Sequence, residues 1–148
     1  MPGAFAHVGI TVSDMDRAVR FYRDTLGLTM VGDVTFAGDE ADTLTGEQQV
    51  KLRAVYFRSP DDQKGAPIEL LHFVEPQGGG KPYERLTNPG ITEVAFWVKD
   101  IEETYADLRA KGVSFYSAPQ LFELDGYRVK AVYFRDPDGT TLELIQRA

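Results

Sequence analysis

An internal repeat constrains the fold of this chain more than any other feature. Residues 54–58 and 131–135 both read AVYFR, and a turn containing proline and aspartate follows each copy. Each turn leads into a short apolar segment that centres on a glutamate. Earlier landmarks recur in the same order, since 7–14 resembles 93–100 and a glycine closes the helical segment that follows each. The chain is therefore predicted to be a tandem duplication.

Hydrophobic periods predict the elements of each half. Residues 7–12 alternate between apolar and polar side chains, which is typical of a strand, and the apolar positions that follow recur at helical spacing up to Gly27. A second helix is expected from Asp100 to Gly112. The other strands are expected at 28–36, 50–58 and 67–73 in the first half, and at 93–98, 113–117, 127–135 and 140–146 in the second.

These elements indicate an α+β protein with one domain, residues 1–148. A first βαβββ module is expected at 4–73 and a second at 91–146, with a glycine-containing linker at 74–90. Residues 33–49 are polar and acidic and are predicted to form a loop.

Composition excludes several classes of function. With 23 acidic and 16 basic residues, the net charge of −7 disfavours nucleic acid or an anionic membrane as partner. The absence of cysteine excludes disulfides and thiolate metal sites. No apolar run approaches the roughly 20 residues that span a bilayer, and no signal peptide is visible, so a cytoplasmic location is expected.

Side chains able to bind a metal recur on one face of four strands. Alternation places Val94, Phe96 and Val98 on the face that packs against a helix. The same alternation directs four metal-competent residues to the face away from the helices: His7, Glu69, Glu93 and Glu143.

Together these motifs resemble the vicinal oxygen chelate superfamily, which includes glyoxalase I, methylmalonyl-CoA epimerase, extradiol dioxygenases, and fosfomycin- and bleomycin-resistance proteins. The resemblance is carried by 7–14, 18–22 and 26–28 in the first half and by 136–139 and 142–144 in the second. It implies the glyoxalase-like fold, in which paired modules with curved mixed sheets form a cup around one divalent metal ion. It also implies a homodimer.

Family ligands lie on the first and last strand of each module, which implies a metal held by His7, Glu69, Glu93 and Glu143 in this chain. Glu93 departs from the family, because many members have histidine there. Three glutamates about 4 Å apart would repel one another by about 4 kcal/mol per pair at an effective dielectric constant near 20, and a divalent cation removes that penalty. An oxygen-rich set suits Mg²⁺, Mn²⁺, Fe²⁺, Co²⁺, Ni²⁺ or Zn²⁺.

The resemblance implies a metal-dependent lyase or isomerase similar to glyoxalase I or methylmalonyl-CoA epimerase. In such chemistry a proton moves between adjacent carbons of a small-molecule substrate through a metal-bound enediolate. Glu143 or Glu93 would carry the proton. Other residues expected to line the substrate pocket are Trp97, Tyr56, Tyr133 and Glu47.

Two alternatives stay open. A metal-free protein of the bleomycin-resistance type would bind a drug or metabolite in the same cup, and the replacement of histidine by Glu93 favours it. An extradiol-type dioxygenase would need a second histidine at position 93. The other histidine, His72, is three residues from Glu69 and is therefore predicted to point to the opposite face of its strand.

Overall fold

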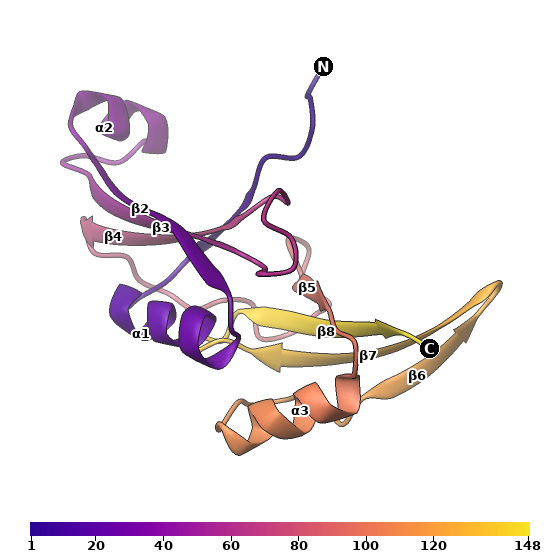
Figure 1. Ribbon diagram of the computed structural model, residues 1–148. Helices are drawn as coiled ribbons and strands as arrows, with labels where there is room; N and C mark the ends of the chain where they lie inside the picture. The colour runs from indigo at the N-terminus through magenta and orange to yellow at the C-terminus, as the bar shows by residue number, and fades with distance from the viewer. The chain divides into compact units, whose positions relative to one another are not determined.

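The computed structural model describes residues 1–148 and confirms an α+β fold built from two βαβββ-like modules (Figure 1). Two compact units are present, Met1–Gly80 (unit 1) and Lys81–Ala148 (unit 2). Unit 1 contains β1 (Val8–Thr11), α1 (Met15–Val19), the π-helical turn η1 (Arg20–Thr25), β2 (Thr29–Ala37), α2 (Asp39–Thr45), β3 (Lys51–Arg58) and β4 (Ile68–Glu75). Unit 2 contains β5 (Val94–Trp97), α3 (Ile101–Ala110), β6 (Gln120–Leu124), β7 (Tyr127–Arg135) and β8 (Thr141–Arg147).

Each unit contains one mixed four-stranded sheet with the same strand order. The orders are β1-β4-β3-β2 and β5-β8-β7-β6. The first strand of each unit pairs in parallel with the last, and the remaining pairs are antiparallel. This topology places Gly9 opposite Glu69 in unit 1 and Ala95 opposite Glu143 in unit 2. Glu69 therefore lies beside β1, which begins directly after His7. Glu143 lies beside β5, which begins directly after Glu93.

The helices form for the same local reasons in both units. The carboxylate of Asp14 accepts a hydrogen bond from the Arg17 backbone N–H at 2.9 Å. The carboxylate of Asp100 accepts one from the Glu103 backbone N–H at 3.0 Å. Such N-caps satisfy amide groups that the first helical turn leaves unpaired.

The core of each unit lies between its helix and one face of its sheet. Figure 1 shows α1 and α3 each lying along a sheet face of their own unit. The largest fully buried side chains are Tyr22, Phe57, Leu70 and Val55 in unit 1, and Phe134, Ile101 and Leu142 in unit 2. Burying side chains of this size supplies most of the free energy that stabilises such a layer. On the second face of the unit 1 sheet, Leu71 and Phe73 pack against a smaller cluster that includes Ala41 of α2.

The prediction of a loop at 33–49 is wrong for most of its length, because β2 continues to Ala37 and α2 follows it. Ala41 on α2 is buried against Val50 and Leu52, with Leu71 and Phe73 packed on the same cluster. The Asp42 carboxylate accepts hydrogen bonds from the backbone N–H groups of Gln49 at 2.9 Å and Val50 at 2.7 Å. The packing of Ala41 therefore stabilises α2, although the polar composition of this segment predicts a loop.

The strand predicted at 113–117 is also wrong. Residues there make one isolated bridge, Phe115 to Phe134, and the regular strand β6 begins only at Gln120. Pro119 has no backbone N–H to donate, so it interrupts pairing between the bridge and β6. A two-residue turn, Asp125-Gly126, then joins β6 to β7, and Gly126 has a φ of 90°. The sequence signal for this hairpin is the Asp-Gly pair itself.

No helix of this structure is long and apolar enough to cross a membrane.

Candidate metal site

In unit 1, strand pairing brings two of the predicted ligands together. His7 immediately precedes β1, and Glu69 lies on the neighbouring strand β4. His7 Nε2 is 3.1 Å from Glu69 Oε2. The imidazole is 47% exposed, whereas Glu69 as a whole residue is only 9% exposed. An accessible nitrogen thus faces a nearly buried carboxylate.

The other oxygen of Glu69 is held by Tyr56. Tyr56 and Glu69 are directly opposite in the register of β3 and β4, and the tyrosine hydroxyl donates to Glu69 Oε1 at 2.5 Å. This hydrogen bond, together with burial and the charge of Glu69, raises the pKa of Tyr56 to about 12. Tyr56 therefore keeps its proton at neutral pH and remains a donor to the carboxylate.

In unit 2, the structure couples the other two predicted ligands electrostatically. Glu93 immediately precedes β5, and Glu143 lies on β8 opposite Tyr133. Burial raises the pKa of Glu143, and the negative charge of Glu93 raises it further. Burial also raises the pKa of Tyr133, with Glu143 and then Glu93 adding to the effect. Burial and the charge of Glu93 both disfavour the carboxylate form of Glu143, so a cation beside the pair would be stabilised.

The donor set fits a divalent cation. Neighbouring ligands of an octahedral ion with bonds of about 2.1 Å lie about 3.0 Å apart, close to the separation of His7 Nε2 and Glu69 Oε2. The ligand atoms are one imidazole nitrogen and carboxylate oxygens, which suit first-row divalent ions and Mg²⁺. Within neither unit do three or more such side chains cluster closely enough to hold an ion alone.

The residues predicted to line a pocket are placed differently from one another. Trp97 is 62% exposed at the end of β5, with the Arg147 guanidinium 5.1 Å from its ring centroid. Tyr56 and Tyr133 each lie opposite the glutamate of a last strand. Glu47 is exposed in the loop after α2, and its backbone N–H donates to the Thr45 hydroxyl at 3.3 Å. His72 Nδ1 is 3.1 Å from the Val12 carbonyl oxygen, as expected for a residue that does not face the ligands.

Sequence reasoning missed the hydrogen bond between Tyr56 and Glu69. The signal was present, because the central tyrosine of each AVYFR copy falls opposite the central glutamate of the strand that follows it.

Sequence reasoning also missed the position of α2. Leu71 and Phe73, which pack on the α2 cluster, alternate with Glu69 along the same face of β4. Figure 1 shows α2 on the other side of this sheet from α1.

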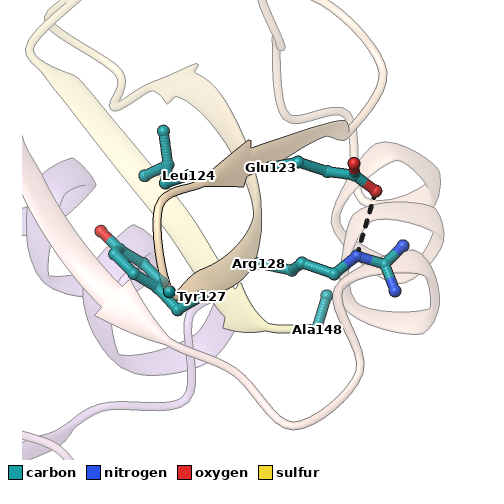
Figure 2. A pocket seen from close by; sticks show the side chains of 6 residues that line it. Glu123, Leu124, Tyr127, Arg128 and Ala148 are labelled. Carbon is teal, nitrogen blue, oxygen red and sulfur yellow. Dashed lines mark ion pairs between the residues drawn. The ribbon is translucent and has the colours of Figure 1, made fainter.

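One surface hollow lies away from these residues. Figure 2 shows it at the turn between β6 and β7, where Leu124 and Tyr127 point to one side and Glu123 and Arg128 to the other. Arg128 Nε and Glu123 Oε1 are 3.3 Å apart. This hollow is six residues along β7 from Tyr133, or about 20 Å at the rise of a strand, so it is separate from the glutamates of unit 2.

Comparisons with known proteins agree with this fold. Residues 4–144 match the Glyoxalase/Bleomycin resistance protein/Dioxygenase superfamily, and the chain belongs to that family. An uncharacterised protein of Bacillus subtilis, YurT, is 30% identical over 93% of this chain and 94% of its own length. A lactoylglutathione lyase of Haemophilus influenzae is 27% identical over 95% of this chain and 90% of its own length.

Solved structures confirm the fold. A glyoxalase family protein from Bacillus cereus superposes with a TM-score of 0.81 at 23% identity, covering 97% of this chain and 93% of that one. The glyoxalase I of Leishmania major, described as trypanothione-dependent, superposes with a TM-score of 0.67 at 21% identity, covering 98% of this chain and 87% of that one.

Proposed function

We propose that this protein is a divalent-metal-dependent lyase or isomerase of the glyoxalase type, acting on a small molecule. The observation that carries the proposal is the chemistry of the repeated positions. In each unit the glutamate of the last strand is paired with a residue that precedes the first strand, which is His7 in unit 1 and Glu93 in unit 2. The likeness to lactoylglutathione lyases supports this choice among the activities of the family.

The metal would be held by His7 and Glu69 of unit 1 and by Glu93 and Glu143 of unit 2. When bound, a divalent ion would polarise two neighbouring oxygens of the substrate and stabilise negative charge on them. The protein supplies the remaining features. Glu69 is held by Tyr56, so its carboxylate keeps one orientation. Trp97 presents an exposed aromatic surface on the same strand face as Glu93, which suits the apolar part of a substrate.

Glu143 is the residue best suited to move a proton. In the metal-free protein, burial and the charge of Glu93 raise its pKa, so this carboxylate accepts a proton more readily than an ordinary glutamate. As a carboxylate, Glu143 would take a proton from one substrate carbon, hold it, and return it to the adjacent carbon. The negative charge of Glu93 favours the protonated form of Glu143. Glu93 therefore assists the proton transfer through Glu143.

Metal analysis of protein purified without chelator tests this proposal. We expect about one equivalent of a first-row divalent ion or Mg²⁺, and a rise in melting temperature when that ion is added to chelator-treated protein. The Glu143→Gln variant should lose turnover of a 2-oxoaldehyde hemithioacetal or an epimerisable thioester. A metal-free wild type whose melting temperature equals that of Glu143→Gln would contradict the proposal.

A second function is favoured by one observation. His7 Nε2 already lies 3.1 Å from Glu69 Oε2, so this carboxylate oxygen has a neighbouring side chain without an ion. This supports a metal-free protein of the bleomycin-resistance type that binds a drug or metabolite without turnover. Stoichiometric ligand binding that survives EDTA treatment would support this function, whereas loss of binding with EDTA would count against it.

Two further expectations accompany the proposed function. A cytoplasmic homodimer is expected, and light scattering coupled to size-exclusion chromatography measures the oligomeric state. A mass near that of one 16.5 kDa chain would contradict the dimer.

A further inference from the structure

The two copies of the repeat hold the same glutamate in different ways. In unit 1 both carboxylate oxygens of Glu69 have partners, the Tyr56 hydroxyl at 2.5 Å and His7 Nε2 at 3.1 Å. In unit 2 Tyr133 occupies the matching position opposite Glu143, yet no hydrogen bond joins the two side chains. The duplication has therefore kept the residue types and changed the contact.

We propose that Tyr56 is a positioning residue for Glu69. Its hydroxyl fixes one carboxylate oxygen and so directs the other toward His7, which makes unit 1 a pre-arranged pair of metal ligands. This inference rests on the proposed metal site and adds a residue that acts on the metal only through Glu69.

A single hydrogen bond from the Tyr56 hydroxyl is enough to order the carboxylate of Glu69. Glutamate has three rotatable side-chain bonds, and ordering such a chain costs free energy when a ligand binds. A short hydrogen bond from a phenol to a carboxylate is charge-assisted and stronger than a neutral one. Because Tyr56 is set in the middle of β3, its hydroxyl is a fixed point, and a carboxylate bound to it is ordered before any ion arrives.

Glycines on the neighbouring strands leave room for this arrangement. A Cβ atom at Gly32 on β2 would lie 3.2 Å from Tyr56 Cδ2, which is tighter than an ordinary contact. A Cβ atom at Gly9 on β1 would lie 3.8 Å from Glu69 Oε2. The Tyr56 ring therefore packs closely over Gly32, where a larger residue would press on it, and Gly9 lies beside the carboxylate of Glu69.

The matched variants Tyr56→Phe and Tyr133→Phe test the inference, because each removes one hydroxyl from an equivalent position of the repeat. The chain has only two histidines, so long-range ¹H–¹⁵N spectra of the metal-free protein resolve His7 and His72. We expect the imidazole signals of His7 to move in Tyr56→Phe and to stay unchanged in Tyr133→Phe. His72, which contacts the Val12 carbonyl, serves as internal reference in both.

Calorimetric titration with Ni²⁺ gives a second measurement on the same proteins. Removal of a hydrogen bond to a ligand typically weakens metal binding 10- to 100-fold, so Kd should rise at least about tenfold in Tyr56→Phe. It should change less than about twofold in Tyr133→Phe. A purely structural role for Tyr56 would lower the melting temperature without this selective change in His7 and in Kd.

The outcomes separate this inference from the proposed function. Unchanged His7 signals in Tyr56→Phe overturn the inference, and so do equal effects of the two variants. A wild type that binds no Ni²⁺, but whose His7 signals respond to Tyr56→Phe alone, overturns the proposed metal-dependent function and supports the positioning role.

Discussion

At the scale of single residues, the chain uses one type of side chain for opposite purposes. Glu69 is nearly buried, and the hydrogen bond from the Tyr56 hydroxyl stabilises its charge, while His7 Nε2 lies 3.1 Å from its other oxygen. Glu143 is partly buried beside a second carboxylate, which raises its pKa. A compensated carboxylate suits a fixed ligand, and an uncompensated one suits a proton carrier.

Glu143→Gln should change the pH dependence of stability in the metal-free protein. The pKa of Glu143 is higher in the folded state than in the unfolded state, so the folded wild type loses stability as pH rises above the ordinary range of glutamate. Glutamine does not ionise, so the variant does not lose stability in this way. We expect the variant to have the larger free energy of unfolding at pH 7, measured by urea denaturation.

The same comparison at low pH is the control. Below the ordinary pKa of glutamate, the carboxyl group is protonated in both states, and the difference between wild type and variant should shrink. A constant difference across the whole pH range would show that the substitution acts through packing and not through charge.

Asp100→Ala should reduce stability by removing an N-cap. The Asp100 carboxylate accepts from the Glu103 backbone N–H, and loss of such a cap costs about 1 kcal/mol. Asp100→Asn keeps an acceptor and should cost much less. Chemical denaturation of both variants measures the difference; equal losses would show that negative charge, and not the hydrogen bond, matters.

At the scale of elements, α2 and β6 are the two that local sequence patterns did not predict. Both lie where the two modules diverge, after the helix and before the strand that carries AVYFR. Their boundaries depend on one buried contact in α2 and on one proline and one glycine around β6. The repeat predicts β6 as the counterpart of β2 but does not give its bounds, and it gives no information about α2, which has no counterpart in unit 2.

Gly126→Ala should destabilise the hairpin between β6 and β7. Gly126 has a φ of 90°, a left-handed conformation that costs a residue with a side chain about 1–2 kcal/mol. The matched control is Gly78→Ala, because Gly78 does not have a positive φ and nothing lies within 4 Å of its would-be Cβ. Thermal melts should show a loss for Gly126→Ala only. Equal melting temperatures for the two variants would contradict a strained turn.

At the scale of the whole molecule, each unit has its own sheet and its own helix-packed core, and unit 1 has a second small cluster under α2. Fragments 1–80 and 81–148 are expected not to fold when expressed separately, since chains of this length bury a smaller share of their surface than the full chain does. Circular dichroism should show no cooperative thermal transition for either fragment, in contrast to the full chain. A sharp transition in one fragment would show that this unit is a domain by itself.

The sequence by itself determined the duplication and most of the strands, and it predicts the strand faces that carry His7, Glu69, Glu93 and Glu143. These features depend on periodicity and on repeated landmarks, which are local and can be counted along the chain. The tertiary structure decided that Tyr56 holds Glu69 whereas Tyr133 does not hold Glu143. It also decided that residues 39–45 form a helix. Both depend on contacts between residues far apart in sequence, where differences below 1 Å determine whether a hydrogen bond forms.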